Sequence, residues 1–171
     1  LNKNNIKSLV IDHHEITKPF PKANIIINPK KDNGYVQYDY LCATSLTYFF
    51  LDMLKKKIQC EIDLKKFLIY VLLATVCDVM PIRNLNRLIA IIALKEFNLS
   101  KNQAFSELYR LTQKKNKVNI NDLGYLIGPI LNSGGRLGRS NNATELLSSE
   151  DKNIITKKSK ELIELNNKRK K

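Results

Sequence analysis

A short apolar run near the start of the chain constrains the fold more than any other feature. The run extends from Ser8 to Ile11 and is followed at once by a polar cluster, Asp12, His13 and His14. Such a run is typical of a strand that is buried on both faces of a parallel sheet. Ligands of open α/β sheets bind at the carboxyl ends of the strands, where this strand delivers its polar residues. The pattern therefore predicts an α/β fold with a ligand site beside Asp12.

The rest of the sequence predicts one more strand followed mainly by helices. Residues 23–28 form a second strand, which Pro29 stops. The segment 40–54 is apolar almost all round, so we expect a buried helix that ends in three lysines. Asp63 is expected to cap the next helix. Further helices are predicted at residues 64–75, 86–97, 102–112 and 142–147.

From residue 149 onward the pattern predicts a polar helix with a basic end. Its thin apolar stripe cannot be buried without a partner. The stripe consists of Ile154, Ile155, Leu162 and Leu165.

The charge is strongly one-sided. The 171 residues include 29 Lys and Arg against 16 Asp and Glu, a formal net charge of +13. This surplus favours a polyanionic partner, such as nucleic acid or an anionic membrane, and argues against a cationic ligand. Coding bias is the alternative, because the chain is also rich in Lys, Asn and Ile. The length allows one ordinary domain or a large part of one.

The cysteine pattern and the hydropathy exclude two classes of protein. Three cysteines without a CxxC pair are expected to be reduced thiols in a cytoplasmic protein, not a disulfide scaffold. No segment has the roughly 20 apolar residues that a membrane span needs. Membrane association ranks last, because the basic tail lacks the aromatic and bulky apolar face of an interfacial helix.

Asp12, His13 and His14 are the sharpest candidates for chemistry. Imidazole nitrogen and carboxylate oxygen are suitable ligands for a divalent ion such as Mn²⁺. Adjacent residues at a strand end point to opposite faces, so one imidazole could bind metal while the next faces a substrate. The alternative is a hydrogen-bonded surface turn.

Asp78 is the second candidate, because it lies in the apolar segment 74–81. A buried, unpaired carboxylate costs several kcal/mol, so Asp78 needs a partner. A metal ion, Arg83 or Arg87, and a helix N-terminus remain equal alternatives.

The third candidate is the glycine cluster at residues 133–138, which contains Arg136. Its backbone N–H groups could approach an anion closely while the guanidinium binds a phosphate. The alternative is a tight turn with an exposed arginine. The basic tail, residues 157–171, supports nucleic-acid binding only weakly, because a lysine-rich helix face is usually just solvated.

Three segments carry the candidate residues: VIDHHE at 10–15, ATVCDVMPIRNLNR at 74–87 and IGPILNSGGRLG at 127–138. Taken in order, they resemble the motifs of the DHH phosphoesterase superfamily and, within it, of the RecJ exonucleases. The third segment separates RecJ from the oligoribonuclease-like and pyrophosphatase-like members. The resemblance spans nearly the whole chain and implies the C-terminal part of a DHH-type parallel-sheet domain, with few strands and mostly helices. Residues 1–148 would belong to that partial domain, and residues 149–171 would begin a long interdomain connecting helix.

The resemblance also implies a function. It implies a 5′-to-3′ exonuclease specific for single-stranded DNA, which acts in repair and recombination and uses Mn²⁺ or Mg²⁺ to activate water for attack on a phosphodiester. His13 and Asp78 would bind metal with Asp12 beside them, and Asp12 and His14 would be catalytic, with His14 contacting the scissile phosphate. The implied phosphate- and DNA-binding residues are Asn132, Gly135, Arg136 and Arg139.

The departures from the family pattern change what the chain is expected to do alone. RecJ takes its first metal ligands from a D-x-D-G-type motif and a further aspartate before DHH, and only eleven residues precede Asp12. The DHH-associated domain is also absent, and Ile130 stands where the family usually has Arg. We therefore expect an internal fragment that is a weak or inactive nuclease with an exposed sheet edge. A split gene, a decaying gene and an incomplete record are the alternative origins; if the gene is split, a separately encoded upstream fragment would complete the site.

Two other functions remain open. The chain could belong to another DHH-type phosphoesterase that acts on short oligonucleotides or a nucleotide phosphate. It could also be a non-enzymatic nucleic-acid-binding remnant that keeps Arg136 and the basic helix.

Overall fold

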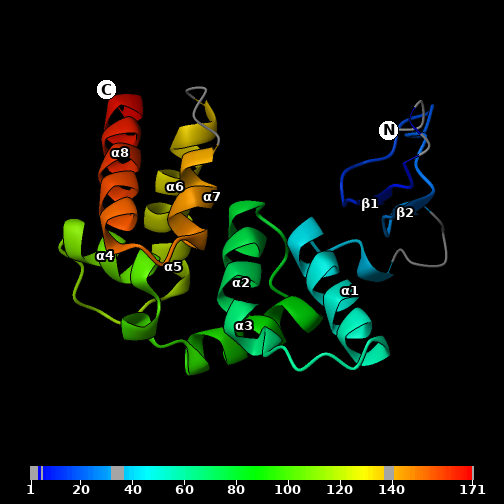
Figure 1. The fold of residues 1–171 in the computed structure, drawn as a ribbon, viewed down its shortest axis with the longest axis horizontal. Coiled ribbons are helices and arrows are strands. Elements are labelled where there is room, and N and C mark those ends of the chain that lie inside the picture. Colours follow the sequence, from blue (N-terminus) through cyan, green and yellow to red (C-terminus); the bar gives the residue numbers. More distant parts are fainter. Residues whose placement is uncertain (1–3, 5, 32–36, 137–140, 171) are drawn as a thin grey trace. The chain divides into compact units, whose positions relative to one another are not determined.

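The computed structural model describes residues 4, 6–31, 37–136 and 141–170, and has two compact units (Figure 1). The first unit is Leu1–Ala93 and the second is Leu94–Lys171. The chain is mostly helical with a small parallel sheet, which confirms the α/β class. The expected domain boundary after residue 148 stays a prediction.

The first unit contains the sheet and the helices that pack near it. Its strands are β1, Leu9–Ile11, and β2, Ile25–Ile27. Its helices are α1, Ala43–Lys57, the 3-10 helix η3, Leu64–Phe67, α2, Leu68–Cys77, and most of α3, Asn84–Glu96.

The two strands pair in parallel, as expected. Val10 lies opposite Ile26, and the N–H of Asp12 donates to the carbonyl of Ile27 at 3.0 Å. The expectation that the first strand is buried on both faces is wrong for this chain. Leu9 is 40% exposed and Ile25 is 58% exposed. The reason is that the described sheet has only two strands, so neither lies in a sheet interior.

The core of the first unit is built on α2, not on α1. Asp63 caps η3 as predicted, by accepting from the N–H of Lys65 at 3.0 Å. The helix α1 is not buried as expected, because it packs against α2 on one side and leaves Met53 72% exposed. The fully or nearly buried apolar residues of α2 and α3 are Leu68, Ile69, Val71, Leu72, Leu73, Ile89, Ala90 and Ala93.

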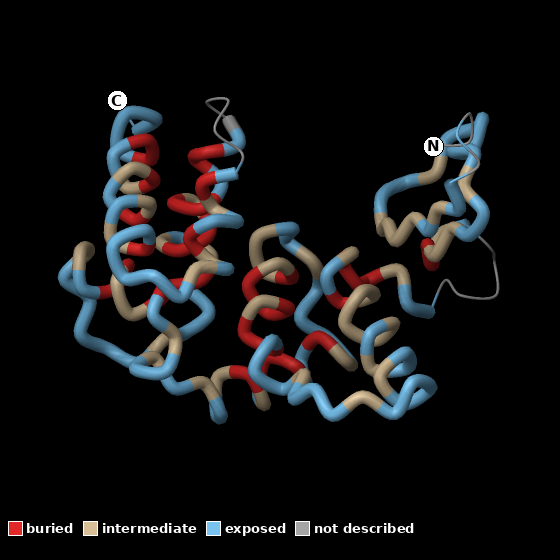
Figure 2. The backbone as a smooth tube through the Cα atoms, viewed as in Figure 1, coloured by how far each residue is buried: buried red, intermediate tan, exposed pale blue. Residues whose placement is uncertain are grey.

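The second unit consists of helices and loops, without a strand among the described residues. It contains the 3-10 helix η4, Leu99–Lys101, α4, Gln103–Leu111, α5, Ile120–Asp122, the π-helix η5, Leu123–Ile127, α6, Gly128–Arg136, α7, Asn141–Ser148, and α8, Lys152–Lys170. The helix α8 lies against α4, α6 and α7, and its buried positions face these helices (Figure 2). Three of the four predicted stripe residues of α8 are buried, and Ile154 is 41% exposed instead.

The glycine cluster is helical as far as Arg136, so the tight turn that was the alternative interpretation does not form there. Residues 133–136 complete α6, and residues 137–140 lie outside the described part of the chain. Packing explains the difference, because Ser133 and Gly134 are buried. The Ser133 hydroxyl donates to the backbone carbonyl of Leu162 on α8 at 3.0 Å. Small residues thus allow α6 to approach α8 closely.

Three helices end in the same left-handed turn without a glycine. After α2, the N–H of Met80 donates to the carbonyl of Thr75 at 3.0 Å, and that of Val79 donates to the carbonyl of Val76 at 3.1 Å. This is the Schellman pattern, whose left-handed position is usually glycine. The residues in that position are Gln59 (φ 53°), Val79 (φ 55°) and Gln113 (φ 57°). Val79 is the most strained of the three because it is β-branched.

Replacing Val79 by glycine should stabilise the protein. The side chain is 87% exposed, so Val79→Gly loses little packing and relieves the left-handed strain. We expect the free energy of unfolding to rise by about 1 kcal/mol, measured by urea denaturation with circular dichroism. Val118→Gly, at a valine without a positive φ, should have the opposite effect. A loss of stability in Val79→Gly would contradict this account.

Candidate functional site

The end of β1 and the end of α2 bring two predicted metal residues together. His13 Nε2 lies 3.5 Å from Asp78 Oδ2. The His13 side chain is only 11% exposed, whereas that of Asp78 is 44% exposed. Of the partners considered for Asp78, Arg83 instead lies 3.5 Å from Asp39. The charged or polar neighbour of Asp78 is therefore the His13 imidazole, not the Arg83 guanidinium.

The other two residues of the DHH segment form a second pair. His14 Nδ1 lies 2.7 Å from Asp12 Oδ1, and the His14 side chain is 77% exposed. Burial acts to raise the pKa of Asp12, but hydrogen bonds from the His14 side chain and the backbone of His13 and His14 outweigh it and lower that pKa. Asp12 is therefore ionised at neutral pH, and the two imidazoles of the segment occupy different environments.

Asp78 occupies a position that helix stability alone does not favour. It is the C-cap of α2, where the helix dipole presents its negative end. The next residue, Val79, has the strained left-handed conformation. Two consecutive residues next to His13, Asp78 and Val79, are thus unfavourable for the local stability of the helix end. Sequences break local rules of this kind mainly at functional sites.

Asn28 fixes the backbone of the DHH segment, a role that the sequence analysis did not identify. Its side chain is buried, and its Nδ2 donates to the carbonyl of His14 at 3.0 Å. Its Oδ1 accepts from the N–H of Lys30 at 2.9 Å. The sequence feature that could have indicated this role is the position of Asn28 between an apolar strand and Pro29.

Asn86 does the same for the loop that follows Asp78. It is fully buried, and its Nδ2 donates to the carbonyls of Tyr40 at 2.8 Å and Pro81 at 3.0 Å. Among the described residues its Oδ1 has no hydrogen-bond partner. Asn86 thus ties the loop after α2 to the segment before α1. The only sequence feature that pointed to Asn86 was its position in the second motif, residues 74–87.

The third motif lies in the second unit. Asn132 and Gly135 are exposed on α6, and among the described residues a Cβ atom added at Gly135 would have no neighbour within 4 Å. The expected cradle of loop amides is wrong for residues 133–136, because helical N–H groups bond to carbonyls one turn earlier. Arg136 ends α6, and its side chain, like all of Arg139, lies outside the described part of the structure.

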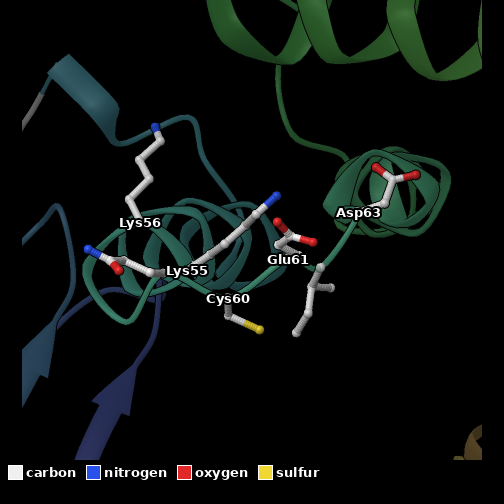
Figure 3. A pocket seen from close by; sticks show the side chains of 7 residues that line it. Lys55, Lys56, Cys60, Glu61 and Asp63 are labelled. Atoms are coloured by element: carbon white, nitrogen blue, oxygen red, sulfur yellow. The ribbon is translucent and has the colours of Figure 1, made fainter.

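A hollow at the C-terminal end of α1 shares no residue with these motifs. Figure 3 shows it between the last turn of α1 and Asp63. Lysine and carboxylate side chains both line it, so its charge is mixed. The lining residues are Lys55, Lys56, Gln59, Cys60, Glu61, Ile62 and Asp63.

Comparison with known proteins gives a consistent result. No protein-family model matches the chain. The RecJ single-stranded-DNA-specific exonuclease of Bacillus subtilis is 26% identical over 165 residues, which cover 95% of this chain and 20% of that protein. The RecJ of Haemophilus influenzae is 25% identical over 99% of this chain and 31% of its own length.

Solved structures share the fold. The Mn²⁺ complex of RecJ from Thermus thermophilus gives a TM-score of 0.84 at 21% identity, covering 98% of this chain and 25% of that one. An exonuclease RecJ bound to manganese also gives 0.84, at 20% identity over 99% of this chain and 42% of that one. The chain is RecJ-like. The resemblance that the three motifs indicated is confirmed, and the chain spans a fifth to about a third of the curated relatives it matches.

The His13–Asp78 pair is the candidate metal site of the RecJ-like chain. Imidazole and carboxylate at 3.5 Å are a suitable donor pair for a divalent ion. Within residues 4, 6–31, 37–136 and 141–170, however, no three His, Cys, Asp or Glu side chains group as metal ligands. The donors present therefore fit a metal only in part. No helix in these ranges is long and apolar enough to span a membrane.

Proposed function

We propose that this chain carries part of the active site of a RecJ-type exonuclease, which degrades single-stranded DNA from 5′ to 3′ in repair and recombination. The observation that carries the proposal is the distance of 3.5 Å between His13 and Asp78, which come from motifs 65 positions apart. Nearly all of this chain also aligns with a part of RecJ. The location supports the proposal, because ligands of open α/β sheets bind outside the carboxyl ends of the strands and His13 follows the end of β1.

In this proposal His13 and Asp78 bind Mn²⁺ or Mg²⁺, with Asp12 beside them. When bound, the ion supplies a Lewis acid for the phosphodiester and lowers the pKa of an attacking water. The exposed His14 contacts the scissile phosphate, and its pairing with Asp12 at 2.7 Å fixes the direction of its ring. Different partners for the two adjacent imidazoles support this division of roles.

In this proposal the third motif and Arg139 contact the nucleic acid. Asn132, Gly135, Arg136 and Arg139 are the proposed phosphate- and DNA-binding residues. The exposure of Asn132 and Gly135 on one helix supports this role, because both remain accessible to a ligand. The excess of lysine and arginine in the chain supports an anionic partner.

A separately encoded upstream fragment is the proposed partner of the chain. Two described donors are fewer than the three or more protein ligands usual in a catalytic metal site. The half-exposed Leu9 and Ile25 support the same partner, because a parallel sheet is normally covered on both faces. Further strands would supply both the missing ligands and the cover.

Mn²⁺ titration by calorimetry tests the metal pair. The chain alone should bind one ion weakly, and His13→Ala and Asp78→Asn should each abolish the binding, because each removes one of two donors. Glu164→Gln, which removes an exposed carboxylate on α8, is the control and should bind like the parent chain. A tight two-ion site in the isolated chain would refute the incomplete-site interpretation.

Hydrolysis assays test the reaction. Adding a fragment that carries the D-x-D-G motif should restore hydrolysis of long single-stranded DNA, and His14→Ala should remove it again. Preference for dinucleotides in the reconstituted enzyme would favour the other DHH-type phosphoesterases. No hydrolysis, together with salt-dependent DNA binding that survives His13→Ala and Asp78→Ala, would favour the non-catalytic remnant.

The variant Gly135→Ala should change the stability of the protein and its affinity for nucleic acid in opposite directions. In a helix, alanine is more favourable than glycine by up to about 1 kcal/mol, and the added Cβ meets no atom within 4 Å. The free energy of unfolding should therefore rise. If a nucleic-acid backbone approaches this face, the affinity for a single-stranded oligonucleotide should fall, as measured by fluorescence anisotropy. Unchanged affinity would remove Gly135 from the binding surface.

A further inference from the structure

The helical segment 120–136 presents one continuous uncharged face to solvent. Its exposed residues are Ile120, Asn121, Tyr125, Asn132 and Gly135, and the half-buried Pro129 lies between Tyr125 and Asn132. From Asn121 to Gly135 the positions on this face, with Pro129 included, are three or four residues apart. The opposite side is packed into the second unit, where Leu123, Ile127 and Ile130 are almost fully buried. We call the solvent side the outer stripe; it consists of Asn121, Tyr125, Pro129, Asn132 and Gly135.

Tyr125 is the unusual member of the outer stripe. It is 83% exposed and lies in the middle of the π-helix η5. A phenol ring that touches so little protein contributes little to the core. π-helical turns are rare and occur frequently at functional sites. The exposed ring and the unusual turn are two separate observations at the same position.

A buried polar cluster fixes this turn in place. The Tyr109 hydroxyl donates to Asp122 Oδ2 at 2.9 Å, and Lys114 Nζ lies 3.1 Å from Asp122 Oδ1. The N–H of Asp122 is capped by Asn119 Oδ1 at 3.0 Å. Burial, together with the Asp122 carboxylate, raises the pKa of Tyr109, so the phenol remains a donor. The π-helix therefore begins at an anchored point.

The same cluster brings positive charge to one end of the outer stripe. Lys114 ties the loop 113–119 to Asp122, less than one turn before Tyr125. Lys115 and Lys117 of that loop are exposed. The stripe itself has no carboxylate, so a polyanion placed along it meets cations at this end and no repulsion on the way.

We propose that Tyr125 stacks on a base of a single-stranded nucleic acid whose backbone follows the outer stripe. Proteins bind single strands by combining exposed aromatic rings with basic residues, because every base has a π-face and every nucleotide a charge. Tyr125 supplies such a ring, and the lysines of the loop 113–119 supply the positive charge. The proposal rests on the proposed function for the nature of the ligand, and adds a contact to the bases. It predicts affinity that depends on bases without depending on their order.

Oligonucleotide binding by the full chain tests the contact. A thymidine oligonucleotide should bind more tightly than an abasic strand of equal length. Tyr125→Leu should weaken binding of the first by about five- to 150-fold and leave the second unchanged, because only stacking is removed. Tyr125→Phe keeps the ring and should restore the preference. Circular dichroism of each variant checks that the helices are retained.

A fluorescence signal reports the stacking directly. The chain contains no tryptophan, so Tyr125→Trp introduces a single indole on the outer stripe. Its emission should be quenched by the thymidine oligonucleotide and not by the abasic strand. Tyr38→Trp, at a tyrosine that is 39% exposed in the first unit, is the matched control and should show little quenching.

The outcomes separate this contact from the function on which it rests. If the parent chain prefers base-bearing strands and Tyr125→Leu does too, the stacking contact is refuted while DNA binding stands. If the parent chain binds both strands equally, the contact is likewise refuted. If it binds neither, the proposed function fails together with the contact. Quenching by an added upstream fragment alone would assign the ring to a protein interface instead.

Discussion

The parallel pairing of β1 with β2 determines where the candidate metal residues lie. The ladder ends where the N–H of Asp12 donates to the carbonyl of Ile27, so the DHH segment begins at the point where the sheet stops. Asn28, the next residue after β2, then holds the backbone of His14. A one-residue slip in register would turn every side chain to the opposite face. The approach of His13 to Asp78 depends on this register.

Locally unfavourable choices accumulate around the candidate sites and not elsewhere in the helices that carry them. Asp78 places a negative charge at the negative end of α2, and Val79 places a branched side chain in a left-handed turn. In the second unit, Tyr125 lies unburied on a π-helix. A sequence selected for stability alone would contain none of the three. Asp78 and Val79 lie in the second of the three segments that resemble RecJ motifs, and Tyr125 lies two positions before the third.

Patterns that are local in sequence predicted the elements correctly. The two strands, the Asp63 cap and the stripe of α8 follow from spacing and from single residues with clear conformational preferences. The same reasoning failed where packing overrides preference. Glycines at 134 and 135 predict a loop, but contact with α8 makes Ser133 and Gly134 interior helix residues. The roles of Asn28 and Asn86 were missed because their partners lie 14 and 46 positions away.

Several of the hydrogen bonds that hold the candidate sites share one chemical property. Asn28 bonds to the carbonyl of His14, Asn86 to those of Tyr40 and Pro81, and Ser133 to that of Leu162. Every acceptor is a backbone oxygen, which any amino acid at that position would provide. These hydrogen bonds therefore do not depend on the side chains that they position. Replacing His13, His14 or Asp78 would leave all of them in place, so evolution could remove the candidate chemistry of this chain while retaining its fold.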